Sequence, residues 1–334
     1  MIKIEENKSI REFNTIGVSA KTFKYCKISD IKSLLYILKS NSLPLKILGG
    51  GSNILWTNDF LGLTLHINIK GVFIENETDS HVIVNINAGE NWHDFVLWSL
   101  KNGYGGIENL ALIPGNVGAA PIQNIGAYGV ELQEVFIECS AIDIKTLKTK
   151  IFSAKDCEFG YRDSVFKNRQ KNNYIITSIK IKLTKNGFHK LNIEYGDIKN
   201  FISDDNVNPT KIAEAVIRIR NSKLPNPKKL GNCGSFFKNP IIDEVLFKKL
   251  NKKFTKIPNY PFDGKYKIPA AWLIEKLKYK GYRKGNVGVH KDQALIIVNY
   301  GNSSGREILE LSDQIKNDVS KTFGIKLETE VNIW

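Results

Sequence analysis

A segment of 25 residues in the first half of the chain, Gly105–Gly129, constrains the fold more than any other feature. It contains neither Lys nor Arg, although the chain has 48 such residues, and nearly all of it is small or apolar. Such a segment lets the backbone approach a flat ligand with polar edges. Tight packing alone is the alternative, but the repeated Gly and Ala around Asn116, Gln123 and Asn124 favour a cofactor site.

A second glycine-rich segment, Gly49-Gly50-Gly51-Ser52-Asn53, directly follows an apolar run at Leu45–Leu48. Consecutive glycines allow backbone N–H groups to form an anion-binding nest, and the Ser and Asn side chains can add hydrogen bonds. The segment matches neither G-x-G-x-x-G nor G-x-x-x-x-G-K-[ST], so a Rossmann fold or a P-loop is not indicated. Taken alone, it fits a plain loop equally well.

Apolar periodicity predicts a mixture of helices and strands. The predicted strands are Leu45–Leu48, Val82–Asn87, Ile175–Leu183, Ala294–Asn299 and Leu327–Trp334. The predicted helices are Asn91–Lys101, Pro209–Asn221 with Asn208 as its cap, Ile242–Leu250, Ala270–Leu277 and Arg306–Phe323. Because the elements do not alternate strictly as βαβ units, the predicted class is α+β. Domain boundaries are expected near residue 68 and within Lys223–Lys229, and 334 residues fit two or three domains.

The formal charge of +14 raises the possibility of a nucleic-acid-binding protein. However, the chain has seven Arg and no dense basic run interleaved with aromatic residues, so we expect no nucleic-acid partner. A surface rich in solvated lysines explains the charge, and its positive field can attract phosphate-bearing ligands.

The remaining composition points to a cytoplasmic protein without a metal. No apolar run approaches the roughly 18 residues that span a membrane, and the N-terminus lacks the apolar core of a signal peptide. The cysteines at positions 26, 139, 157 and 233 form no C-x-x-C pair, and the histidines are scattered. We therefore expect reduced thiols, no membrane insertion and no metal site.

The two glycine-rich segments also carry a resemblance. G-G-G-S-N followed by I-P-G-x-V-G-A-A-P-I-Q-N-I-G-A-Y-G resembles the FAD-binding part of the UDP-N-acetylenolpyruvoylglucosamine reductase family, within the vanillyl-alcohol-oxidase-like superfamily. The order and spacing of motifs extend the resemblance from Phe13 to the C-terminus. The further motifs are Tyr161–Lys167, Lys223–Pro227, Gly231–Pro240, His290–Leu295 and Leu327–Val331.

The resemblance implies an α+β fold with a two-part FAD-binding region of vanillyl-alcohol-oxidase type and a C-terminal α+β substrate-binding domain. The implied parts are residues 1–68, to which a strand at 326–334 returns, then 69–222, and then 223–325 for the substrate. It also implies a monomer that reduces UDP-N-acetylglucosamine enolpyruvate to UDP-N-acetylmuramate with NADPH, through FAD.

Three catalytic residues are carried over by position. Arg162 matches the cation that stabilises an enolate-like intermediate, and Ser235 matches the proton donor. Glu330 matches the catalytic carboxylate, but periodicity alone does not distinguish it from Glu328 on the same strand face. Where the family usually has Arg two residues after this Glu, the chain has Asn332, so any site contact of that Arg is in doubt.

The resemblance also assigns binding residues. Expected FAD contacts are Gly49, Gly50, Gly51, Ser52, Asn53, Pro114, Gly115, Gly118, Ala119, Gln123, Asn124, Gly126, Ala127, Tyr128 and Arg220. Expected substrate contacts are Tyr195, Lys223, Asn239, Tyr260 and Gln293, with Tyr195 on a substrate-covering loop of the longer, type I form.

A second enzyme class keeps the same fold but oxidises an alcohol or a sugar lactone. Such oxidases often attach FAD through a His, and neither glycine-rich segment contains one. The K-L-P-N-P and G-S-F-F-K-N-P segments would also have no role in an oxidase. These observations favour the reductase.

Overall fold

The computed structural model describes residues 2–202 and 206–334, and the chain divides into two compact units. Unit 1 comprises the described parts of residues 1–8, 22–50 and 61–222. Unit 2 comprises residues 9–21, 51–60 and 223–334. Both units mix helices with mainly antiparallel sheets, so the predicted α+β class is confirmed. The three-part division expected from the sequence stays a prediction.

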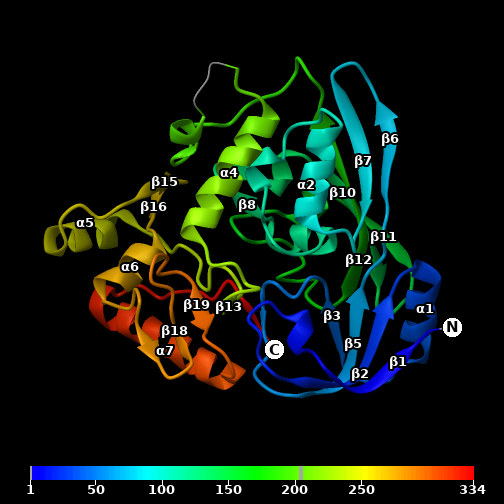
Figure 1. Cartoon of the computed structure of the whole chain (residues 1–334), viewed down its shortest axis with the longest axis horizontal. Helices are drawn as coiled ribbons and strands as arrows, with labels where there is room; N and C mark the ends of the chain where they lie inside the picture. The colour runs from blue at the N-terminus through cyan, green and yellow to red at the C-terminus, as the bar shows by residue number, and fades with distance from the viewer. Residues whose placement is uncertain (1, 203–205) are drawn as a thin grey trace. The chain divides into compact units, whose positions relative to one another are not determined.

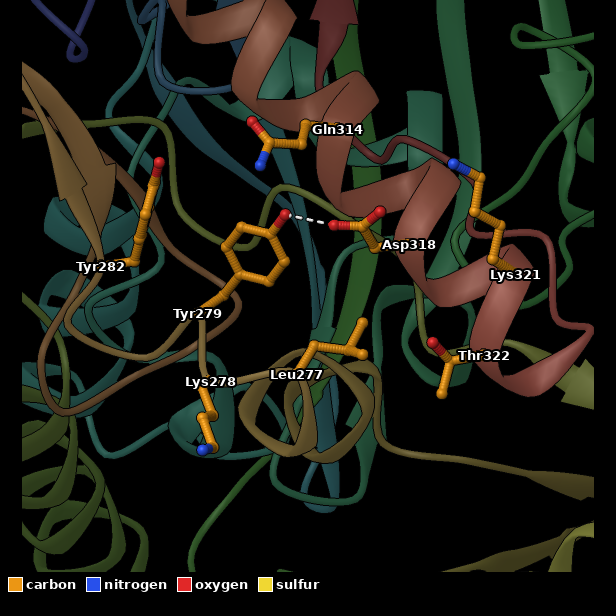
Figure 2. A pocket seen from close by; sticks show the side chains of 8 residues that line it. All are labelled: Leu277, Lys278, Tyr279, Tyr282, Gln314, Asp318, Lys321 and Thr322. Atoms are coloured by element: carbon orange, nitrogen blue, oxygen red, sulfur yellow. Dashed lines mark hydrogen bonds between the residues drawn. The ribbon is translucent and has the colours of Figure 1, made fainter.

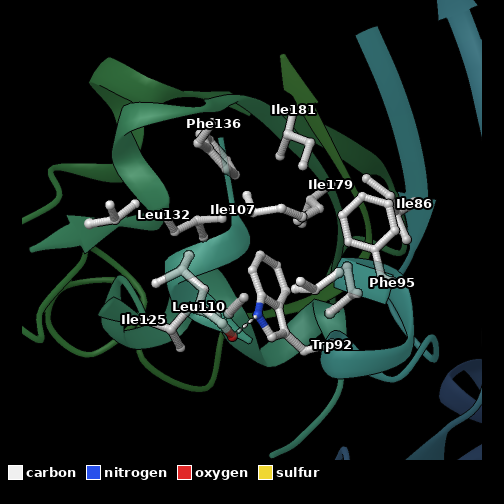
Figure 3. Close-up of a cluster of buried hydrophobic side chains, with 14 of the residues drawn as sticks. Ile86, Trp92, Phe95, Ile107, Leu110, Ile125, Leu132, Phe136, Ile179 and Ile181 are labelled. Atoms are coloured by element: carbon white, nitrogen blue, oxygen red, sulfur yellow. Dashed lines mark hydrogen bonds between the residues drawn. The ribbon is translucent and has the colours of Figure 1, made fainter. Parts of the chain in front are cut away.

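The larger sheet of unit 1 has five antiparallel strands in the order β11-β10-β12-β7-β6. Their bounds are β6 Val72–Glu77, β7 His81–Asn87, β10 Phe136–Asp143, β11 Thr149–Ser153 and β12 Tyr174–Thr184. The alternation predicted at Ile175–Leu183 holds from Thr177 to Leu183, where every second residue is buried. At the start of β12, Ile175 and Ile176 are both buried, next to a register shift between β12 and β10. In that core, Trp92 and Phe95 of a helix pack with Ile179 and Ile181 of β12 (Figure 3).

The smaller sheet of unit 1 has the order β1-β2-β5-β3 (Figure 1). Its strands are β1 Ile4–Ser9, β2 Lys21–Ile28, β3 Leu45–Leu48 and β5 Phe60–Ile67. Helix α1, Ile31–Ser40, buries Leu34, Ile37 and Leu38 against it, and Asp30 caps the helix by accepting from the Ser33 amide at 2.7 Å. β3 has the predicted bounds and runs parallel to β5 at the edge of the sheet, so the first glycine segment follows a half-buried strand.

The predicted helix boundaries of unit 1 follow from their caps. α2, Trp92–Lys101, is capped by Asn91, and Gly103 after it takes the left-handed φ of 73° that favours glycine. α4, Pro209–Lys223, is capped by Asn208, whose side chain accepts from the Lys211 amide at 3.0 Å. α4 ends two residues later than predicted. Unit 1 also contains the short elements α3 Ala154–Cys157, β8 Gly126–Ala127 and β9 Val130–Glu131.

Unit 2 combines small sheets with three helices. The sheets have the orders β13-β19-β18-β17, β14-β16-β15 and β20-β4. The strands are β4 Ile54–Leu55, β13 Gly231–Asn232, β14 Ile241–Ile242, β15 Tyr260–Phe262, β16 Lys265–Lys267, β17 Arg283–Lys284, β18 Val287–Val289, β19 Ile297–Asn299 and β20 Asn332–Ile333. The helices are α5 Glu244–Lys253, α6 Ala270–Lys276 and α7 Gly305–Phe323.

Three predicted elements of unit 2 differ from the structure by two residues or more, whereas α6 and α7 differ from the prediction by one residue each. The helix expected at Ile242–Leu250 begins at Glu244, because Asp243 caps it by accepting from the Leu246 amide at 2.8 Å. The strand expected at Ala294–Asn299 is shortened to β19. The strand expected at Leu327–Trp334 is observed only as β20 and an isolated bridge between Thr329 and Phe237. It is interrupted because its backbone bonds first to residues 236–238 and then to residues 53–55.

A pocket of about 370 Å³ lies between the end of α6 and α7 in unit 2 (Figure 2). Tyr279 points towards α7, and its hydroxyl donates to Asp318 Oδ2 at 2.6 Å. Burial, together with this carboxylate, raises the pKa of Tyr279 to about 12, so the hydroxyl stays protonated. The eight lining residues include none of the site residues predicted from the sequence.

Candidate active site

In unit 1, Gly49 and Gly50 of the first glycine-rich segment meet the second segment. A Cβ added to Gly50 would lie 2.8 Å from Gly115 Cα and 3.0 Å from Asn116 Oδ1. A Cβ added to Gly49 would make an ordinary 3.7 Å contact with Asn116 Cβ. The backbone of one segment therefore packs directly on the backbone of the other, which a side chain at position 50 would prevent.

Residues 115–118 of the longer segment run beside residues 88–92. The Trp92 amide donates to Gly115 O at 2.9 Å, and the Gly118 amide donates to Ala88 O at 2.9 Å. A Cβ on Gly118 would lie 2.5 Å from Ala88 Cβ. Gly118 is thus required for packing inside the unit, whatever contact it makes with a cofactor.

The longer segment continues as a 3₁₀ helix, Val117–Gln123, that ends at Asn124 with a left-handed φ of 44°. The Asn124 amide group donates to Glu131 Oε2 at 2.9 Å and to Gly160 O at 3.1 Å, and its Oδ1 accepts from the Gln133 amide. Because the Asn124 side chain is buried and used by the protein itself, a flavin contact at this residue would come from its backbone.

Arg162 lies in a loop that holds its guanidinium against the same segment. The guanidinium donates to Gly126 O, forms an ion pair with Glu131 Oε1 at 3.4 Å and lies over the Tyr161 ring at 5.3 Å. A Cβ on Gly126 would lie 2.7 Å from Arg162 Nη1, so glycine at this position leaves room for the guanidinium. The Arg162 side chain is 17% exposed, and its φ of 53° is unfavourable for a residue with a Cβ.

Arg220 on α4 supplies a donor that lacks a partner. Its Nε is buried and finds no hydrogen-bond acceptor within the described parts of the chain. Burial lowers the pKa of this guanidinium, while Tyr128 acts in the opposite direction, which places Tyr128 near it. A buried unpaired donor is costly unless a ligand satisfies it. This donor and the glycine contact at Gly50 both fit a bound FAD.

Tyr195 lies on a loop that is held on the longer glycine segment. Its ring meets the Tyr128 ring edge-on, with the centroids 6.4 Å apart. Buried Asn109 donates both to Tyr128 O at 3.0 Å and to Asn192 O at 2.8 Å. Asn109 thereby joins the predicted cofactor segment to the predicted substrate-covering loop.

Unit 2 brings together three predicted residues that are far apart in the sequence. The amide of buried Phe236 donates to Leu295 O at 2.8 Å, and the Glu330 amide donates to Phe236 O at 2.9 Å. The residue before Phe236 is Ser235, whose side chain is exposed, and Gln293 lies two residues before Leu295. Ser235, Gln293 and Glu330 are therefore carried by three segments that meet at Phe236.

The structure also distinguishes the two glutamates near the C-terminus. The Glu328 side chain is 75% exposed and pairs with Lys238 Nζ at 3.2 Å. Glu330 is partly buried, and its carbonyl accepts from Asn53 Nδ2 at 3.2 Å. Glu330 therefore lies beside the end of the first glycine segment, whereas Glu328 points into solvent.

Asn332, the departure from the family pattern, connects the same two segments. Its Nδ2 donates to Asn53 O at 3.0 Å, and its backbone amide donates to that oxygen at 3.1 Å. Asn332 thus fixes the loop that follows the three glycines to the C-terminal strand.

The other predicted substrate residues are more dispersed within unit 2. Lys223 is exposed, and Tyr260 is 46% exposed on β15. Asn239 Oδ1 accepts from the Ala270 amide at 2.9 Å and so holds the start of α6. The sequence did not indicate the supporting roles of Glu131, Asn109 and Phe236, because these roles depend on bonds to segments that are distant in the sequence.

The chain matches two protein-family models. The model of the UDP-N-acetylenolpyruvoylglucosamine reductase C-terminal domain matches residues 226–334, and that of an FAD-binding domain matches residues 23–145. A UDP-N-acetylenolpyruvoylglucosamine reductase of Flavobacterium johnsoniae is 50% identical over 99% of this chain and 100% of the relative. The chain belongs to the UDP-N-acetylenolpyruvoylglucosamine reductase family. The resemblance found in the sequence is therefore confirmed.

Other members of the UDP-N-acetylenolpyruvoylglucosamine reductase family match along the whole chain. The reductase of Bdellovibrio bacteriovorus is 40% identical and covers 100% of both chains. The crystal structure of the Thermus caldophilus reductase shares the fold, with a TM-score of 0.70, 18% identity, and coverage of 100% of this chain and 99% of that one. The FAD-binding model spans both glycine-rich segments, so the prediction that the chain binds FAD is confirmed.

The described residues also bear on the predictions about cysteines, metal ligands and membrane-spanning helices. All four cysteines are free and buried. Within residues 2–202 and 206–334, no group of three or more His, Cys, Asp or Glu could hold a metal ion. No helix in these ranges is both long and apolar enough to cross a bilayer.

A substitution at Gly50 tests the packing of the two glycine segments. Gly50→Ala is expected to lower the free energy of unfolding of the FAD-free protein by about 1–3 kcal/mol, because the new Cβ meets the Gly115 backbone. Gly49→Ala is the matched control, since its Cβ would make an ordinary contact; neither glycine has a positive φ. Urea unfolding measures both variants. Equal stability of the two would contradict the packing.

Proposed function

We propose that this protein reduces UDP-N-acetylglucosamine enolpyruvate to UDP-N-acetylmuramate with NADPH as hydride donor and FAD as bound cofactor. The observation that carries this proposal is the full-length match, at 50% identity, to a relative named UDP-N-acetylenolpyruvoylglucosamine reductase. When bound, FAD supplies the redox chemistry by accepting a hydride from NADPH and passing it to the substrate. The protein supplies binding, charge and the proton.

In unit 1, we assign to Arg162 the stabilisation of negative charge that develops on the substrate. Addition of a hydride to the enolpyruvyl double bond gives an enolate-like species beside the substrate carboxylate. A guanidinium is permanently charged and can bind a carboxylate through two hydrogen bonds. Glu131 and the Gly126 carbonyl orient this guanidinium, and its low exposure limits the screening of its charge by water.

In unit 2, we assign the proton to Ser235 and its support to Glu330. The Ser235 hydroxyl gives its proton to the carbon that carries the developing charge, which completes the reduction of the double bond. A serine hydroxyl is a weak acid, so it donates to a strongly basic partner such as an enolate carbon. The hydrogen bonds at Phe236 that hold the Ser235, Gln293 and Glu330 segments together support these roles.

The binding assignments also form part of the proposal. FAD would be held by Gly49, Gly50, Gly51, Ser52, Asn53, Pro114, Gly115, Gly118, Ala119, Gln123, Asn124, Gly126, Ala127, Tyr128 and Arg220. Lys223 would bind a phosphate of the nucleotide sugar, with Asn239, Tyr260 and Gln293 as further contacts. Tyr195 and its loop would exclude water from the site.

We further propose that the protein acts as a monomer in the cytoplasm. Its product would enter peptidoglycan synthesis and so support cell-wall formation, cell shape and cell division. Binding of a nucleotide sugar that carries two negatively charged phosphates and a carboxylate is consistent with the net positive charge of the chain.

The proposed activity predicts a defined product. In the absence of oxygen, the FAD-loaded protein with NADPH should convert UDP-N-acetylglucosamine enolpyruvate into a product heavier by one H₂, which mass spectrometry identifies. Replacement of NADPH by NADH reports the preference for the donor. If NADPH were consumed only in the presence of oxygen and the substrate were unchanged, the oxidase alternative would replace this proposal.

A further inference from the structure

The turn that leads into Pro114 and Gly115 has an unfavourable backbone conformation. Leu112 has a left-handed φ of 59°, although it carries a Cβ. A left-handed conformation costs a residue with a Cβ about 1–2 kcal/mol, so this turn depends on contacts from outside the segment. Pro114 and Gly115, which follow it, are among the proposed FAD contacts.

The first two residues of α2 provide those contacts. Trp92 Nε1 donates to Leu110 O at 3.1 Å (Figure 3), and the Trp92 amide donates to Gly115 O at 2.9 Å. Between these two points, His93 Nδ1 accepts from the Leu112 amide at 3.0 Å. Of these three hydrogen bonds, the one that His93 accepts is therefore made by the strained residue itself.

An imidazole accepts through Nδ1 only when that nitrogen carries no proton. His93 is partly buried, and burial lowers its pKa below 6.5. The charged groups that act on it are Asp94 on its own helix, which raises the pKa, and Arg220 on α4, which lowers it. The Leu110–Gly115 turn contributes no titratable side chain. At neutral pH, His93 is thus held in the state that can accept from Leu112.

We propose that His93 is a positioning residue that holds the Leu110–Gly115 turn in its FAD-binding conformation, and that protonation of His93 weakens FAD binding. The inference rests on the proposed use of FAD at this turn. A protonated imidazole has a donor at Nδ1, which would face the donor of Leu112 and break the bond. Below the pKa of His93, the protein should therefore release FAD more readily.

Two substitutions of His93 separate its role as a hydrogen-bond acceptor from the effect of its protonation. His93→Asn keeps an acceptor, because Asn Oδ1 occupies nearly the position of His Nδ1, but it does not titrate. His93→Leu removes the acceptor, so the Leu112 amide loses this hydrogen bond. His81→Asn is the matched control, since His81 bonds to Thr78 and Ser80 in a hairpin turn outside the FAD segments.

The affinity for FAD is measured by quenching of flavin fluorescence from about pH 8 down to about pH 4.5, because the lowered pKa of His93 places its protonation below the ordinary histidine range. Wild type and His81→Asn should bind about tenfold more weakly at the acidic end, the loss expected for one hydrogen bond whose partly buried donor is left unpaired. His93→Asn should bind equally well at both ends, and His93→Leu about tenfold more weakly throughout. Amide exchange at Leu112 in the FAD-free protein should be slow in wild type and His93→Asn and fast in His93→Leu.

Two results would overturn the inference while leaving the use of FAD intact. One is a pH dependence of FAD affinity in His93→Asn equal to that of wild type. The other is wild-type affinity and wild-type Leu112 exchange in His93→Leu. Failure of the wild-type protein to bind FAD at any pH would instead refute the proposed function, and this inference with it. Circular dichroism of each FAD-free variant identifies any that does not fold.

Discussion

Ser235→Ala is expected to slow the reoxidation of reduced flavin by the substrate by about 10²–10⁴-fold, the range for loss of a general acid. Reduction of the flavin by NADPH should change little, because that half-reaction needs no proton from Ser235. The effect should also be local. The Ser235 side chain is exposed, while the bonds that hold its segment use the backbone of Phe236.

Anaerobic stopped-flow absorbance measures the two half-reactions of Ser235→Ala separately. Ser40→Ala on α1 is a suitable control, because Ser40 bonds only to backbone carbonyls of its own helix in the described contacts. If both half-reactions slowed equally, the substitution would have disturbed flavin binding, and the proton-donor role would be wrong. Unchanged reoxidation would be equally decisive against it.

Glu330→Gln is the second substitution with a large expected effect. It removes the carboxylate but keeps the size of the side chain, so reoxidation by the substrate should slow by about 10²–10⁴-fold. The strand provides its own control two residues earlier. Glu328 is 75% exposed and pairs with Lys238, and an exposed ion pair contributes at most about 1 kcal/mol, so Glu328→Gln should react almost as fast as wild type.

The same stopped-flow measurement on the two glutamine variants decides between the glutamates. Comparable slowing in both would mean that the effect arises from the net charge of the strand. Slowing in Glu328→Gln alone would move the catalytic role to that residue and would contradict the assignment drawn from the family pattern.

Local signals in the sequence were sufficient for most helices and for the long strands. Asn91 and Asn208 are good caps, and the apolar spacing behind them matches the buried faces of α2 and α4. The last strand was predicted too long, because alternation alone does not reveal where backbone partners end. Likewise, apolar spacing predicts a helix start at Ile242, two residues early, because the spacing includes Ile242 whereas the cap at Asp243 sets the observed start.

In the candidate site, too, the sequence reveals local features but not contacts between distant segments. Glycine-rich segments are visible in the sequence, and their packing at Gly50 and Gly115 agrees with the expectation that they act together. The pairing of Arg162 with Glu131, and of His93 with Leu112, depends on contacts between distant segments. No periodicity or spacing encodes such pairs. The roles of Arg162, Ser235 and Glu330 came from the family resemblance rather than from the residues alone.

The most direct test of the central claim is the visible absorbance of the purified protein under anaerobic conditions. A flavin spectrum should bleach when NADPH is added and return when UDP-N-acetylglucosamine enolpyruvate is added. Recovery with oxygen but not with this substrate would contradict the reductase function while keeping the FAD-binding fold. A protein that showed no flavin spectrum and took up no added FAD would contradict the account as a whole.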